Sequence, residues 1–304
     1  MLEIKNKHFE LQQVASGIYA AIAKDGGGAA SNAGFVDLGD QTLIFDTFNT
    51  QQASSELKKY AEEISGSKIS WVINSHYHGD HIRGNQVFPS CNILSSKTTY
   101  TKMKEIQPTR ILSQKQDLKG LRTYICALEK TLHETHDQKI ECQIKSLIEL
   151  ENSLPTLNLT LPTITFQEFH TFKGSNLSAM LYTKGAGHSP CDSFLYIPEE
   201  KVIFMGDLLF VNSHPSLFED SDVDNWIATL QELLTWDFNT AIPGHGPVGT
   251  KNDLEQIIQY FTELKHISCR EDNPNQLEIP DPYKNWSLPD LFLRNLKQLR
   301  QLSK

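Results

Sequence analysis

The densest group of side chains able to do chemistry lies in the segment Ser75–Asn85, which reads SHYHGDHIRGN and directly follows the hydrophobic run WVIN. Its four candidate metal ligands are His76, His78, Asp80 and His81. Side chains alternate along an extended chain, so two histidines that stand two residues apart can share one side. Gly79 permits a turn that carries the next two candidates toward a second point. Because zinc accepts imidazole and carboxylate ligands readily, the segment predicts two neighbouring metal positions.

Three later segments each place one candidate ligand among small or apolar residues. GAGHSPCDS contains His188, FMGDLLF contains Asp207, and AIPGHGPVG contains His245. The glycines beside the two histidines let the backbone approach a shared centre closely. Asp207 follows an apolar run, where an unpaired carboxylate would be costly to bury, and metal coordination would offset that cost. We therefore expect these three side chains to complete the ligand set.

Short β-rich runs separated by turn residues surround these ligands. The expected strands are Gly17–Ala23, Ala33–Leu38, Gln41–Asp46, Ile69–Asn74, Thr163–Phe169, Ser178–Thr183, Ser193–Ile197, Val202–Met205 and Thr240–Ile242. Apolar residues at helical spacing predict helices at Ser54–Ser65, with Ser54 as N-cap, and at about Asp224–Leu234, Lys251–Ser268 and Leu288–Leu302. A sandwich of sheets covered by helices is the natural architecture for such a pattern.

The middle of the chain has a different character, because residues 98–155 are polar and favour helix. We interpret them as a helical insertion within a single domain of residues 1–304, which ends in a C-terminal helical tail at 270–304. Two interpretations of the insertion stay open. It either covers apolar surface or forms a lid or dimer face above the metals.

In order and spacing, the candidate ligands resemble those of the metallo-β-lactamase superfamily, His-x-His-x-Asp-His followed by His, Asp and His, over roughly residues 17–250. The resemblance implies an α/β fold, a four-layer αββα sandwich, with the site at one edge between the two sheets. It also implies that Asp207 bridges two metal ions. By the same resemblance one ion is bound by His76, His78 and His188, and the other by Asp80, His81 and His245.

The resemblance further implies a hydrolase in which a metal-bridging hydroxide attacks the substrate. Two zinc ions per chain are expected, with iron or manganese as alternatives. Asp80 is expected to orient the nucleophile or move its proton, and Asp46 to orient metal-bound histidines from behind. His214, in FVNSHPSLF shortly after Asp207, is a candidate for the substrate pocket.

Composition narrows the class of partner. The formal net charge of −9 disfavours nucleic acid, which is gripped mainly by clustered Lys and Arg. No apolar stretch approaches the ~20 residues that span a bilayer. The start MLEIKNKHFELQQ lacks the pattern of a secretory signal, and the five cysteines are scattered, so a cytoplasmic protein is expected. We expect a small-molecule substrate and leave a homodimer open.

The superfamily supports several reactions, so the resemblance alone does not choose among them. Zinc β-lactamases most familiarly place Cys where this chain has Asp207, which resembles the thioesterase, lactonase and nuclease branches instead. The leading hypothesis is hydrolysis of a small ester, lactone or thioester. Alternatives are a phosphodiesterase, a β-lactamase-type amide hydrolase, and a non-enzymatic metal-holding binding or sensor protein.

Overall fold

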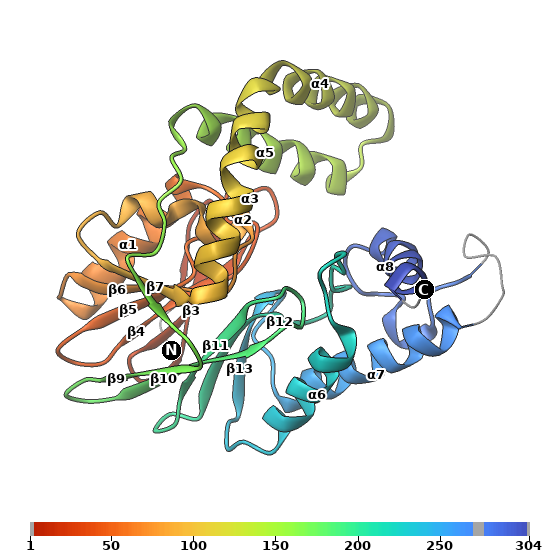
Figure 1. The fold of residues 1–304 in the computed structure, drawn as a ribbon. Helices are drawn as coiled ribbons and strands as arrows, with labels where there is room; N and C mark the ends of the chain where they lie inside the picture. Colours follow the sequence, from red (N-terminus) through yellow and green to blue (C-terminus); the bar gives the residue numbers. More distant parts are fainter. Residues whose placement is uncertain (1–2, 270–276, 303–304) are drawn as a thin grey trace.

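The computed structural model describes residues 3–269 and 277–302 and contains two β-sheets between layers of helices (Figure 1). The first sheet has the order β1-β2-β3-β4-β5-β6-β7-β8, and the second the order β13-β12-β11-β10-β9. The first sheet consists of β1 Glu3–Lys5, β2 Phe9–Ala15, β3 Ile18–Ala23, β4 Ala33–Asp37, β5 Thr42–Phe45, β6 Ile69–Asn74, β7 Asn92–Ser96 and β8 Ile164–Phe166. The second consists of β9 Phe169–Lys173, β10 Ser178–Gly185, β11 Asp192–Ile197, β12 Val202–Phe210 and β13 Thr240–His245.

Three hydrophobic cores hold the layers together. α1, Gln51–Ser65, buries Ala53, Leu57 and Ala61 against the outer face of the first sheet. Between the sheets, Phe45 and Phe204 face each other with ring centroids 5.4 Å apart. Three helices cover the outer face of the second sheet: α6 Val223–Leu234, α7 Lys251–Ser268 and α8 Asp290–Leu302. The predicted αββα sandwich is therefore confirmed.

The predicted helical insertion is present as three consecutive helices, α3 Lys97–Gln116, α4 Leu118–Thr135 and α5 Gln138–Ser153. In Figure 1 the pair α4 and α5 projects from the sandwich, whereas α3 begins at the first sheet, directly after β7, and leads out to this pair. Gln51 at the start of α1 donates to the carbonyl of Ser153 at 2.8 Å, which ties the end of the insertion to the sandwich. The predicted tail at 270–304 lies partly outside the described residues, and its described part contains α8.

Several predicted boundaries were wrong. α1 begins at Gln51 with Thr50 as its N-cap, because the Thr50 hydroxyl accepts from the amide of Ala53, whereas the hydroxyl of Ser54 is buried and bonds to the carbonyl of Thr47. The single strand predicted at Thr163–Phe169 is divided between β8 in the first sheet and β9 in the second. Strands β1, β2 and β7 were not predicted.

Among the described residues, none of the helices combines the length and the apolar character needed to pass through a lipid bilayer.

Candidate metal centre

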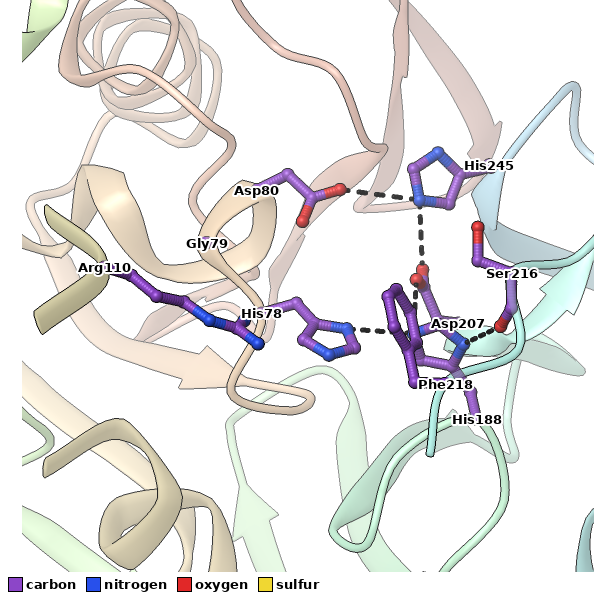
Figure 2. Close-up of a pocket in the computed structure, with 9 residues that line it drawn as sticks. All are labelled: His78, Gly79, Asp80, Arg110, His188, Asp207, Ser216, Phe218 and His245. Carbon is purple, nitrogen blue, oxygen red and sulfur yellow. Dashed lines mark hydrogen bonds and ion pairs between the residues drawn. The ribbon is translucent and has the colours of Figure 1, made fainter. Parts of the chain in front are cut away.

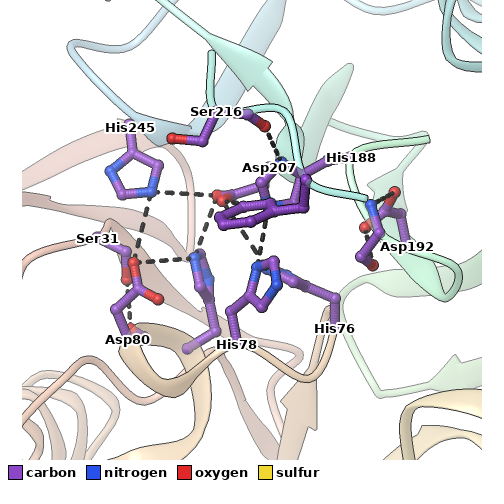
Figure 3. A network of polar contacts seen from close by, with 12 residues as sticks. Ser31, His76, His78, Asp80, His188, Asp192, Asp207, Ser216 and His245 are labelled. Atoms are coloured by element: carbon purple, nitrogen blue, oxygen red, sulfur yellow. Dashed lines mark hydrogen bonds and ion pairs between the residues drawn. The ribbon is translucent and has the colours of Figure 1, made fainter. Parts of the chain in front are cut away.

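The seven predicted ligands meet at one edge of the sandwich, where loops from both sheets converge (Figure 3). Four of them follow β6, two within the loop and two within the short helix α2, Gly79–Ile82. The remaining three come from the β10–β11 loop, from β12 and from the end of β13. They form two groups, whose ligand atoms lie within 4.8 Å of one another in each: His76, His78, His188 and Asp207, and Asp80, His81 and His245.

The first group has the spacing of atoms that share one ion. His78 Nδ1 lies 3.0 Å from His76 Nε2 and 2.9 Å from His188 Nε2. Asp207 Oδ2 lies 3.2 Å from His188 Nε2 and 3.8 Å from His76 Nε2. Ligand atoms about 2.0 Å from a tetrahedral zinc ion are roughly 3.3 Å apart. The group therefore fits a zinc ion without rearrangement of the backbone.

The second group is related to the first through Asp207. Asp207 Oδ1 lies 3.1 Å from His81 Nε2 and 3.4 Å from His245 Nε2. Asp80 Oδ2 lies 3.7 Å and 3.6 Å from the same two nitrogens. Asp207 thus offers one carboxylate oxygen to each group, which is the arrangement of a bridging ligand.

Among the described residues, three buried atoms of the ligand side chains form no hydrogen bond: His78 Nε2, His81 Nε2 and Asp207 Oδ1. The last two lie 3.1 Å apart but are not aligned for a hydrogen bond, so both are open to an ion. Burial raises the pKa of Asp207, but His81 and His245 outweigh it and hold that pKa well below its usual range. Burial lowers the pKa of His81, but Asp207, Asp80 and Asp46 outweigh it and raise that pKa well above its usual range. The buried carboxylates thus favour positive charge at this centre, and a divalent ion could supply that charge while binding unpartnered atoms such as His81 Nε2 and Asp207 Oδ1.

The carboxylate of Asp46 contacts His81 directly and reaches His76 through Ser75. His81 Nδ1 donates to Asp46 Oδ2 at 2.8 Å, and the Ser75 hydroxyl donates to the same oxygen at 2.7 Å. Ser75 Oγ in turn lies 3.0 Å from His76 Nδ1. Each contact engages Nδ1 and leaves Nε2 of the ring facing the centre. Asp46 itself has a φ of 62°, a left-handed conformation that a non-glycine residue adopts at some cost in energy.

Gly244, beside His245, leaves room for the bridging carboxylate. A Cβ atom at this position would lie 1.9 Å from Asp207 Oδ1. The loop is fastened from the first sheet by Asn32, whose side-chain amide donates to the carbonyls of Pro243 at 3.0 Å and Gly246 at 2.8 Å. The small residues around His245 in the sequence therefore allow a close approach of the backbone.

A family model described as the metallo-beta-lactamase superfamily matches residues 26–245. The chain belongs to this superfamily. The match covers most of the chain and includes all seven ligands. Together with the His/Asp cluster it confirms the predicted class, a metallohydrolase of the metallo-beta-lactamase superfamily.

Individual proteins show the same likeness at low sequence identity. Metallo-beta-lactamase type 2 of Bacteroides fragilis is 28% identical over 113 residues, which are 34% of this chain and 45% of that protein. The match thus spans less than half the length of this curated relative. A metallo-beta-lactamase structure from Pontibacter korlensis shares 16% identity at a TM-score of 0.59, covering 84% of this chain and 99% of that chain.

The stereoselective inverting sec-alkylsulfatase Pisa1 from Pseudomonas sp. aligns with a TM-score of 0.69 and 14% identity, over 96% of this chain and 50% of that chain. At such identities the likeness concerns the fold.

A cavity of about 240 Å³ opens over the metal centre (Figure 2). Phe218 forms part of its wall, with its ring centroid 4.8 Å from that of His78. The side chains of Asp80 and His245 are 28% and 22% exposed, so solvent reaches the second ligand group. Arg110, Ser216 and Phe218 also line the cavity and were not indicated by the sequence, whereas Gly79 was expected only as a turn residue.

The position of His214 differs from the expectation. His214 is fully buried and is not among the described residues that line the cavity. Its Nδ1 lies 3.2 Å from the hydroxyl of Tyr260, and its ring packs against Trp286 and Phe292. The prediction of a pocket role was wrong because the chain turns after β12, so that His214 packs against residues of α7 and α8 while Ser216 and Phe218 line the cavity.

Proposed function

We propose that the protein is a dinuclear zinc hydrolase acting on a small ester, lactone or thioester. The observation that carries the proposal is the position of Asp207, with one carboxylate oxygen in each of two ligand groups. Five histidines and two aspartates form a nitrogen-rich set of the kind zinc accepts. When bound, such ions lower the pKa of water toward ~7 and polarise a substrate oxygen.

Residues of the chain itself orient the metal ligands and can transfer protons during the reaction. Asp80 borders the cavity, and its carboxylate is an acceptor for the proton of an attacking water or a donor to the leaving group once protonated. Burial raises the pKa of Asp80, but His81 and His245 outweigh it and lower that pKa, so the carboxylate is ionised at neutral pH. His188 Nδ1 donates to the carbonyl of Ser216 at 3.0 Å, which fixes Nε2 toward the centre.

The volume of the cavity favours a small substrate over a polymer. Its access to solvent favours an enzyme over a protein that only binds or senses metal. Its volume of about 240 Å³ lies below the ~300–1,000 Å³ of pockets for drug-sized ligands. The exposed fractions of Asp80 and His245 leave the centre reachable from solvent, whereas a sealed binding protein would enclose it. The net charge of −9 also disfavours a nucleic acid substrate.

The test combines metal analysis with a substrate panel. We expect two zinc ions per chain and turnover of p-nitrophenyl acetate, dihydrocoumarin or an acyl thioester that a chelator abolishes and zinc restores. Asp80→Asn should lower kcat by about 100-fold or more, since proton transfer contributes roughly 10²–10⁴. Asp237→Asn, which alters a 75% exposed carboxylate, is the matched control and should leave the rate unchanged.

Turnover that ignores the chelator would refute the proposed function. Turnover of bis(p-nitrophenyl) phosphate in place of every ester and thioester would assign a phosphodiesterase instead. Elemental analysis that finds two iron or manganese ions would replace zinc in the assignment.

A further inference from the structure

A positive side chain from the insertion lines the cavity. Arg110 on α3 is the only lysine or arginine among the described lining residues. Figure 2 draws it entering from the side of α3, on the same side as Gly79 and His78. Its guanidinium carbon lies 5.9 Å from the ring centroid of Tyr77, the residue between two ligands. The guanidinium therefore lies beside the metal centre.

Arg110 is not used by the fold as an ion-pair partner. Within the described part of the chain, no carboxylate forms a salt bridge with it at 4.0 Å or less. The neighbouring Arg83, in contrast, donates to the side chains of Asn49 and Gln114 and is largely buried. Asp80 and Asp207 also line the cavity, but neither is within salt-bridge distance of Arg110, so the guanidinium keeps its donors available for a ligand.

α3 is attached firmly to the loop that carries the ligands. Gln107, one turn before Arg110, donates to the carbonyl of Tyr77 at 2.7 Å. Met103 is fully buried and packs with Tyr77 and Ile82. Near the start of the helix, the Thr99 hydroxyl donates to the carbonyl of Cys191 at 3.2 Å. The helix is therefore a fixed wall of the cavity, and it places Arg110 reproducibly.

The charge of the loaded centre has the same sign as Arg110. Asp46, Asp80 and Asp207 contribute three negative charges at the centre when ionised, and two divalent ions contribute four positive charges. The balance is about +1 before Arg110 and +2 with it, or +1 once a hydroxide is present. The cavity of this acidic chain is thus locally positive and attracts anions.

We propose that Arg110 binds an oxyanionic group of the substrate, such as a carboxylate, so that the hydrolase acts on a small ester, lactone or thioester that carries a negative charge. The planar guanidinium presents paired donors that match a carboxylate, a fit that lysine does not reproduce. The inference rests on the proposed function and adds the chemical class of the substrate.

The experiment uses a matched pair of esters, 4-acetoxybenzoate and its uncharged methyl ester, with the zinc-loaded full-length protein. Arg110→Gln should raise KM for 4-acetoxybenzoate by about 10- to 100-fold, the size of a charged hydrogen bond, and leave the methyl ester nearly unchanged. Arg110→Lys should restore part of the difference. Lys104→Gln removes an exposed cation from the same helix outside the cavity and should change neither ester.

A second readout separates this inference from the proposed function. Calorimetric titration of the zinc-loaded protein with 4-hydroxybenzoate should show weaker binding in Arg110→Gln but not in Lys104→Gln, whether or not any ester is hydrolysed. Equal effects of Arg110→Gln on both esters, or unchanged binding of 4-hydroxybenzoate, would overturn the role of Arg110 while chelator-sensitive turnover still supports the hydrolase. Loss of all turnover with intact Arg110-dependent binding would leave this inference standing and remove the proposed function.

Discussion

Asp46 connects ligands of both groups through one carboxylate oxygen. That oxygen accepts from His81 directly and from the Ser75 hydroxyl, which contacts His76. An error in the position of Asp46 would therefore misdirect a histidine in each ligand group. The left-handed backbone at this residue is consistent with a position set by the site rather than by local preference.

Asp46→Asn should weaken zinc binding by about 10- to 100-fold, the usual effect of losing a partner of a ligating histidine. The amide keeps the size of the side chain but removes the charge and one acceptor. Competition between the protein and a chromogenic chelator measures the affinity. Asp40→Asn, at an exposed turn, is the matched control. Equal zinc affinity in the two variants would contradict the role of Asp46 in orienting the histidines.

Gly244→Ala should lower zinc content toward one ion per chain or fewer, because the added methyl group collides with the oxygen of Asp207 that faces His81 and His245. Circular dichroism would show whether the fold is kept. Gly66→Ala is the comparison, since its Cβ meets nothing within 4 Å and only the positive φ of that helix cap is penalised. Full zinc content in Gly244→Ala would show that the loop tolerates the methyl group.

At the scale of elements, the loop after β12 is held by the C-terminal helices. Asn295 on α8 donates to the carbonyl of Pro215 at 2.7 Å and accepts from the amide of Leu217 at 3.2 Å. These contacts surround Ser216, which lines the cavity with Phe218. The helices that cover the second sheet therefore also shape the substrate pocket.

The same cluster contains a histidine that should make stability depend on pH. Burial lowers the pKa of His214 from 6.5 to about 4. The unfolded chain takes up a proton below about 6.5 while the folded chain does not, so stability is complete above pH 6.5 and falls as the pH drops toward 4. The loss attributable to this residue is about 3 kcal/mol or less.

His214→Gln should reduce this acid sensitivity. Urea unfolding at pH 7 and at pH 4.5 would measure the free energy of unfolding that is lost on acidification. The difference in this loss between wild type and variant gives the contribution of His214. His266→Gln, which alters an exposed histidine on α7, should behave as wild type. A wild-type and a His214→Gln protein that lose equal stability on acidification would contradict the assignment.

The ligands were predictable because each lies in or just after a strand, in a short segment of recognisable residue types. The pocket wall was not, because Arg110 lies in a polar helix whose position depends on contacts such as that of Gln107 with Tyr77. The strands β1 and β2 escaped prediction because they are short or, as in FELQQVA, alternate between apolar and polar residues over only four positions. His214 was misplaced because the turn of the loop after β12 depends on α7 and α8.

For the whole molecule, the two ligand groups bridge the sandwich. Four ligands belong to the first sheet's loops and three to the second sheet's strands and loops. Bound ions would therefore stabilise the packing of the first sheet against the second sheet. Without them, the histidines and carboxylates at the centre remain buried with unpartnered atoms, which weakens the folded state.

Removal of metal should lower Tm by about 10 °C, since ligand at a thousand times its Kd contributes about 4 kcal/mol to stability. Differential scanning calorimetry with and without chelator measures the change. Two equivalents of zinc should restore Tm, and magnesium should not, because magnesium prefers oxygen ligands. Identical melting curves for loaded and stripped protein would show that the centre does not hold the halves together.

In the sequence, the insertion separates the four ligands that follow β6 from the three that belong to the second sheet. The chain could therefore be cut within the insertion without removing any ligand. A cut in the turn between α4 and α5 would leave His76, His78, Asp80 and His81 on one fragment and His188, Asp207 and His245 on the other. Each ion draws on both fragments, so neither piece could retain zinc alone. Reassociation of the two fragments could then be followed by measuring the zinc that the mixture takes up.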